Sequence, residues 1–189
     1  MFSKRSFSHL NKFATIDPWN LSTKDVGQNL CQGEWVGTEN YVDHIDPMTG
    51  KPMLKIPNTS MDEIQPFVDS LHECPKYGLH NPFNNKERYL MLGEVCRKTV
   101  EVMHDKEVFD WMVKCSQRAI PKSIQQTEAE VRVTRAFFEN FCGDQVRFLA
   151  RGFSNPGDHE GQMSQGYRFP FGPVGVIAPF NFPVEIPVL

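Results

Sequence analysis

The sequence predicts an α/β fold in which a small antiparallel β element and several helices precede the first strand of a parallel sheet. Turn residues separate short strand-like runs over positions 32–57, and apolar residues follow helical spacing over positions 64–152. Near the end of the chain, the β-branched residues of positions 174–177 lie between prolines. Such a run is typical of a strand that is buried on both faces of a parallel sheet.

The predicted strands of the β element are short. We expect them within residues 32–37 and 42–50 and around residues 55–57. The sequence Asp-Pro-Met-Thr-Gly at positions 46–50 combines residues that favour tight turns. This spacing predicts an early antiparallel element.

Helical periodicity places the following helices at residues 64–71, 89–103, 105–119 and 125–152. Pro66 falls in a first turn, where its missing N–H has no intrahelical partner. Asp105 is the expected cap of the third helix, and Pro121 ends it. The apolar and aromatic residues of these helices are expected to form the core.

A polar, glycine-rich segment at residues 157–166 predicts a hairpin arm or loop before the final strand. Asn181 then follows the carboxyl end of that strand, where open α/β sheets bind ligands. Pro183 suits the first turn of a following helix, so Asn181 is also compatible with an ordinary helix cap, which on spacing alone is the commoner role of asparagine. The spacing leaves the ligand-binding and capping interpretations open.

Composition excludes several classes of function. The chain has 189 residues, 40% of them hydrophobic, and a net charge of −3 with both signs interspersed, which argues against nucleic-acid binding. Prolines break every apolar stretch well short of the roughly 20 residues that span a bilayer, so we expect no membrane partner. The five cysteines form no CxxC pair and the histidines no HExxH spacing, so no metal site is predicted.

The amino terminus is basic and rich in serine, with no acidic residue before Asp17. Wound as a helix, it gathers phenylalanine and leucine on one side and basic residues on the other. Such a segment is similar to a mitochondrial presequence, which we assign to residues 1–20, with the mitochondrial matrix as the expected location. A merely disordered basic tail is the alternative.

The last residues of the chain also predict whether the sequence is a whole protein or part of a longer one. A lone parallel strand has neither a neighbour nor a crossover, and Leu189 falls where a helix is expected. We therefore expect an amino-terminal fragment of a longer protein.

The segment Gly-Pro-Val-Gly-Val-Ile-Ala-Pro-Phe-Asn-Phe-Pro at positions 172–183 resembles the aldehyde dehydrogenase signature around its oxyanion asparagine. Residues 65–71, 74–83, 139–151 and 180–187 are similar to the plant-type Δ1-pyrroline-5-carboxylate dehydrogenases. The resemblance runs from about Leu30 to the last residue. It implies an aldehyde dehydrogenase-like fold, with residues 21–154 and 169–189 in the amino-terminal part of the NAD-binding domain. Residues 155–168 would form an oligomerisation arm, which implies a homo-oligomer.

The resemblance implies a mitochondrial enzyme that oxidises glutamate-γ-semialdehyde to glutamate with NAD in proline catabolism. In this chemistry a cysteine thiolate attacks the small aldehyde substrate, and the Asn181 side chain stabilises the resulting alkoxide. Removing one such donor costs on the order of 100- to 1,000-fold in rate. The chain has no match to the nucleophilic cysteine or the water-activating glutamate, so by itself it is expected to be inactive.

The resemblance also implies roles for the neighbours of Asn181. Ile177, Ala178, Pro179 and Phe180 would lie along the cofactor, and Phe182 would line the substrate tunnel.

We add a hypothesis of our own for Glu185, which stands four residues after Asn181 and so on the same face of a helix. Its carboxylate is placed to meet the α-ammonium of the substrate, and a surface carboxylate without that role is the alternative.

Cys31 follows Gly27-Gln28, which superficially resembles the family's nucleophile context, but the spacing has one residue too many. We reject it as the nucleophile. Two rival functions remain, an aldehyde dehydrogenase for another substrate and a truncated, non-catalytic interaction subunit.

Overall fold

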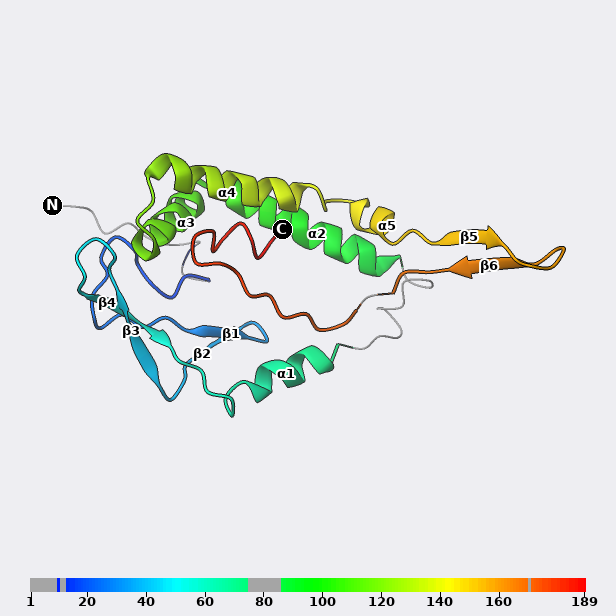
Figure 1. The fold of residues 1–189 in the computed structure, drawn as a ribbon. Helices are drawn as coiled ribbons and strands as arrows, with labels where there is room; N and C mark the ends of the chain where they lie inside the picture. The colour runs from blue at the N-terminus through cyan, green and yellow to red at the C-terminus, as the bar shows by residue number, and fades with distance from the viewer. Residues whose placement is uncertain (1–9, 11–12, 75–85, 170) are drawn as a thin grey trace.

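The computed structural model describes Leu10 and residues 13–74, 86–169 and 171–189. Residues 1–9 and 11–12 of the predicted presequence lie outside the described residues. So do residues 75–83 of the segment 74–83 that is similar to the plant-type enzymes. Figure 1 shows a layer of helices on one side and two small hairpins with a short helix on the other, while a third hairpin projects from the end of the helical layer. None of the described helices is both long and apolar enough to cross a bilayer.

The antiparallel β element is confirmed and consists of two hairpins. Strand β1 (Asn29–Cys31) pairs with β2 (Glu34–Val36), and β3 (Tyr41–Ile45) pairs with β4 (Pro52–Pro57). Gln32 and Gly33 connect the first pair with φ angles of 51° and 84°, the backbone of a two-residue hairpin turn that matches strand twist. The predicted strand 32–37 therefore begins later, because its first two residues form this turn.

The predicted turn at residues 46–50 connects β3 to β4. The backbone N–H of Gly50 donates to the carbonyl of Asp46 at 2.8 Å, and the Asp46 side chain accepts from the N–H of Met48 at 2.8 Å. This Asp side-chain bond to the backbone two residues on is the mechanism that makes aspartate a turn residue.

The first helices follow the predicted positions. Helix α1 spans Gln65–His72 with proline in its first turn, α2 spans Glu87–His104, and α3 spans Lys106–Ala119. The Asp105 side chain caps α3 by accepting from the N–H groups of Glu107 and Val108 at 2.8 and 3.3 Å. Helix α4 spans Ile124–Glu139 and begins with a reciprocal capping box between Ser123 and Gln126.

The predicted single helix over residues 125–152 is wrong. Helix α4 ends at Glu139, and a short helix, α5 (Gln145–Leu149), follows the break. Gly143 lies in the break with φ 61°, which an α-helix cannot contain. The backbone of Gly143 approaches α2 at Gly93 so closely that a Cβ on Gly93 would collide with its carbonyl oxygen. A contact between two glycines therefore ends the helix, and apolar periodicity alone does not reveal it.

The core lies among α2, α3 and α4. Its central cluster takes one buried apolar residue from each helix, Met103, Val113 and Val131 respectively, and the half-buried Phe109, Met112 and Phe138 pack against them. The helical layer in Figure 1 is held by this contact.

The end of the predicted presequence contacts this layer. Leu10 is 1% exposed, and the indole N–H of Trp111 donates to the carbonyl of Ile16 at 3.1 Å. The rings of Phe13 and Trp111 meet edge to face, with centroids 6.1 Å apart. Part of the segment that we assign to a presequence thus packs on α3, and the assignment itself stays a prediction.

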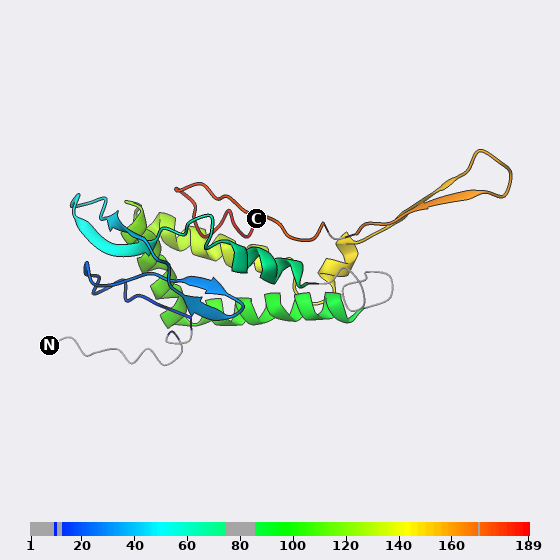
Figure 2. The same ribbon diagram turned by 90° about the horizontal axis from the view of Figure 1, so that it is seen from below.

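The predicted hairpin arm is a hairpin in the structure. Strand β5 (Phe153–Pro156) pairs in antiparallel fashion with β6 (Met163–Gly166). Both views show it projecting away from the body (Figures 1 and 2).

The predicted buried strand at residues 174–177 is wrong for this structure. The segment carries no strand assignment, and Val174, Val176 and Ile177 are 65%, 62% and 99% exposed. No backbone hydrogen bond links residues 171–181 to another described residue. A parallel strand forms only beside a partner strand, and each described strand pairs within its own hairpin.

A glutamate ties the start of β3 to the approach of α1. The Glu63 carboxylate accepts from the Ser60 N–H at 2.8 Å, the Thr38 hydroxyl at 2.7 Å and the Glu39 N–H at 2.7 Å. These bonds, that of Ser60 first, lower the pKa of Glu63 from 4.5 to about 2.

We expect Glu63→Gln to destabilise the protein at pH 7, because a neutral amide accepts these bonds more weakly. The folded pKa lies below the ordinary value, so the contribution is fully present above about pH 4.5 and is lost as the pH falls towards 2. Urea unfolding of both proteins should therefore show a stability difference that shrinks over that window. Glu34→Gln, on an exposed residue of β2, is the matched control, and a difference for Glu63→Gln that is independent of pH contradicts the assignment.

Candidate active site

The residues predicted for the site lie on one continuous segment, residues 177–185. Its first half is extended and apolar: Ile177 is 99% and Phe180 is 83% exposed, while Ala178 is half-buried. An exposed apolar run with free backbone groups is a surface that other groups normally cover.

The helix expected after Asn181 does not form in this structure, where the following residues make successive turns instead. The N–H of Ile186 donates to the carbonyl of Phe182 at 3.3 Å, and the N–H of Leu189 to that of Glu185 at 3.2 Å. Asn181 itself is exposed, and its side chain makes no hydrogen bond with the described residues. The capping interpretation of Asn181 is therefore wrong for this structure.

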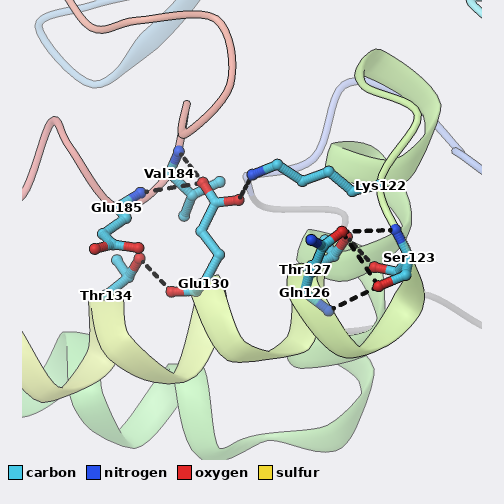
Figure 3. A network of polar contacts seen from close by, with 8 residues as sticks. All are labelled: Lys122, Ser123, Gln126, Thr127, Glu130, Thr134, Val184 and Glu185. Carbon is cyan, nitrogen blue, oxygen red and sulfur yellow. Dashed lines mark hydrogen bonds and ion pairs between the residues drawn. The ribbon is translucent and has the colours of Figure 1, made fainter.

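The cap comes instead from helix α4. One carboxylate oxygen of Glu130, Oε1, accepts from the backbone N–H groups of Val184 and Glu185 at 3.0 and 3.4 Å (Figure 3). The backbone N–H of Glu185 donates to Glu130, so this contact fixes the backbone of Glu185. Asn181 and Glu185 are expected on the same face of a helix, but no regular helix joins them in this structure.

The other oxygen of Glu130, Oε2, accepts from the ammonium of Lys122 at 2.8 Å (Figure 3). The Glu130 side chain is fully buried, and that of Lys122 is 12% exposed. The Lys122 nitrogen also lies 4.0 Å from the ring centroid of Phe182, a cation–π contact. A buried carboxylate needs such partners, because an unpaired charge away from water is strongly unfavourable.

Sequence analysis did not single out Lys122 or Glu130. The sequence does hold a pattern that points to Glu130: Thr127, Glu130, Val131 and Thr134 have the spacing of one helix face. In the structure all four are buried. Glutamate is almost never fully buried without a partner, so a glutamate on such a face predicts a polar contact there.

The described thiols differ in exposure. Burial, and to a smaller extent the negative charge of Asp17, raises the pKa of the Cys115 thiol to about 12. Burial also raises the pKa of Cys96. Both thiols remain protonated at neutral pH. Among the described residues, no group of histidine, cysteine or acidic side chains is arranged to hold a metal ion.

We expect Cys115 to resist alkylation in the native protein, because the thiolate is the reactive species. At neutral pH it should react on the order of a thousand times more slowly than an ordinary thiol. Timed maleimide labelling with peptide mass spectrometry checks this, with the exposed Cys74 as the internal reference. Labelling in denaturant should make the two rates similar, and equal rates in the native protein contradict the expectation.

The sequence profile described as "Aldehyde dehydrogenase family" matches residues 35–189. The chain is 50% identical to "Delta-1-pyrroline-5-carboxylate dehydrogenase 12A1, mitochondrial" of Arabidopsis thaliana over 184 residues, which are 96% of this chain and 33% of that protein. The chain thus spans about a third of the length of the curated relatives it matches.

Solved structures share the fold. The crystal structure of an aldehyde dehydrogenase from Brucella melitensis biovar abortus 2308 matches with a TM-score of 0.72 and 20% identity, covering 93% of this chain and 34% of that one. A putative methylmalonate-semialdehyde dehydrogenase from Sinorhizobium meliloti 1021, complexed with NAD, matches with a TM-score of 0.66 and 19% identity, covering 84% and 31%. The fold class predicted from the sequence is confirmed.

Proposed function

The chain belongs to the aldehyde dehydrogenase family, and we propose from this premise that it forms part of an enzyme that oxidises glutamate-γ-semialdehyde to glutamate with NAD in proline catabolism. The observation that carries the proposal is the 50% identity to a pyrroline-5-carboxylate dehydrogenase over 96% of the chain. That relative is about three times as long, so the proposed activity is that of a complete enzyme of its kind, to which this chain is proposed to contribute part of the site.

Asn181 is proposed as the donor that stabilises the developing oxyanion on the aldehyde oxygen. Its amide is exposed and makes no hydrogen bond with the described residues, so an N–H group is available to a substrate. The turn that follows Asn181 is held by hydrogen bonds to Glu130. The Asn181 amide is therefore not needed to hold that turn. A donor fixed in advance where charge develops is an effective source of catalysis.

Ile177, Ala178, Pro179 and Phe180 are proposed to hold NAD, which accepts a hydride from the aldehyde carbon when bound. The residues fit such a group in two respects: their side chains form an exposed apolar run suited to flat rings, and their backbone groups have no backbone partners among the described residues. Binding there would cover the run and exclude water from the neighbouring Asn181. Phe182 is proposed to line the substrate tunnel, with its ring held by the Lys122 ammonium.

The β5–β6 hairpin is proposed as the oligomerisation arm of a homo-oligomer. It projects from the body, and its strands have unpaired edges, with Phe153 and Met163 64% and 65% exposed (Figure 2). We also propose a location in the mitochondrial matrix. The relative named mitochondrial and the basic, serine-rich amino terminus support it.

We expect Asn181→Ala to lower kcat about 100- to 1,000-fold, because the lost donor acts on the oxyanion. Steady-state kinetics of the complete enzyme with glutamate-γ-semialdehyde checks this. Asn40→Ala removes another exposed asparagine and should leave kcat unchanged. An Asn181→Ala enzyme with the wild-type kcat would refute the assignment.

Glu185 is proposed to meet the α-ammonium of the substrate through its carboxylate. We expect Glu185→Gln to reduce kcat/KM for the semialdehyde by about tenfold or more, as for a weakened charged hydrogen bond, and to leave kcat/KM for a simple aliphatic aldehyde unchanged. The ratio of the two values is the measurement. An unchanged ratio removes Glu185 from substrate recognition and favours another aldehyde as the natural substrate.

A further inference from the structure

We propose that Glu130, oriented by Lys122, is a positioning residue that sets where the Asn181 amide lies in the active site. The inference rests on the proposed function of Asn181 and assigns a new role to two residues of the helical layer. Neither residue is proposed to touch the substrate or the cofactor through the reacting atoms.

The first argument is that little else fixes this segment. Residues 171–181 make no backbone hydrogen bond with other described residues. The turn that follows rests on the helices through Val184 and Val188, which line a cavity of about 440 Å³ together with Met103 and Phe138. Apolar side chains that line a cavity lose part of their van der Waals contacts, and the hydrophobic effect that holds them is non-directional. The hydrogen bonds that join the turn to the helical layer are the two that the N–H groups of Val184 and Glu185 donate to Glu130.

The second argument is that the carboxylate uses both of its oxygens. Oε1 accepts the N–H groups of Val184 and Glu185, and Oε2 accepts the ammonium of Lys122, as Figure 3 shows. A glutamine at position 130 has only one acceptor oxygen. It would turn an NH₂ group towards either the backbone N–H groups or the ammonium, so one donor would face another donor. The contact therefore requires the charged glutamate.

The third argument is that Lys122 holds the other side of the same turn. Its nitrogen lies 2.8 Å from Glu130 Oε2 and 4.0 Å from the centroid of the Phe182 ring. Phe182 directly follows Asn181, and Val184 comes two residues later. The buried pair thus contacts the chain at Phe182, adjacent to Asn181, and at Val184, three residues after it, so a shift of the pair is expected to move Asn181 with it.

The expected consequence is a loss of rate with little loss of binding. A misplacement of about 1 Å at a catalytic group can reduce the rate about 100-fold. An interaction made only in the transition state affects kcat and not KM. We therefore expect Glu130→Gln to lower kcat by about 10- to 100-fold and to change KM by less than about twofold.

The decisive experiment is a double-mutant cycle of Glu130→Gln and Asn181→Ala in the complete enzyme. If Glu130 acts through Asn181, Glu130→Gln should lower kcat in the wild-type background and have less than a twofold effect when Asn181 is already alanine. Equal effects in both backgrounds would overturn the inference while leaving Asn181 in its role. A normal kcat for Asn181→Ala would instead overturn the proposed function itself.

A second measurement does not depend on activity. Hydrogen–deuterium exchange of peptides covering residues 182–189 should be faster in Glu130→Gln, because the N–H groups of Val184 and Glu185 lose their acceptor. Glu128→Gln is the matched control: Glu128 lies two residues before Glu130 on α4, is half-buried, pairs with Arg132 and makes no contact with the last turn, so both exchange and kcat should stay unchanged. Unchanged exchange in Glu130→Gln overturns the inference.

Lys122 variants keep the test available if Glu130→Gln does not fold. Lys122→Met removes the charge and retains most of the apolar stem, so it should lower kcat, whereas Lys122→Arg should restore much of it by keeping the cation. The inference fails if the methionine and arginine variants have the same kcat.

Discussion

The packing of Val131 against Met103 and Val113 determines how α4 lies on α2 and α3, and the position of the candidate site depends on it. Glu130 precedes Val131 on the same helix, and both residues are almost fully buried. A charged group in that place is tolerated only with partners. Lys122 supplies one, and the backbone of the chain end supplies the others. The core contact thereby fixes where the segment after Asn181 attaches.

The same segment changes character at Asn181. Before it, residues 171–180 have no backbone partners among the described residues and are exposed except for the half-buried Ala178. After it, two hydrogen bonds to Glu130 of α4 hold the turn. The exposed half has the composition of a strand that is buried in a parallel sheet. The residues after Asn181 are held by contacts with the helical layer. The Asn181 amide therefore lies where the exposed residues 171–180 meet the turn that is bonded to α4.

Glu63 and Glu130 both accept hydrogen bonds from backbone N–H groups, one near the surface and one in the interior. Glu63 gathers backbone and hydroxyl donors near the surface, and those bonds lower its pKa to about 2. Glu130 gathers backbone donors in a buried position, where an ammonium is also needed. In each case a carboxylate joins segments that are distant in sequence, at a point where backbone N–H groups would otherwise lack acceptors.

The sequence by itself determined the features that depend on neighbouring residues. The Asp105 cap, the proline in the first turn of α1 and the turn at residues 46–50 all rest on contacts within a few positions, so local chemistry predicts them. The signature around Asn181 likewise identified the family. Only the tertiary structure decided the break after Glu139, where Gly143 meets Gly93, and the cap of the last turn, where Glu130 reaches a residue 54 positions away. Tertiary structure also decided that residues 174–177 do not pair, because a strand needs a partner that its own sequence cannot supply. Contacts of this kind depend on which elements meet in space, and helical or strand periodicity does not predict which elements will meet.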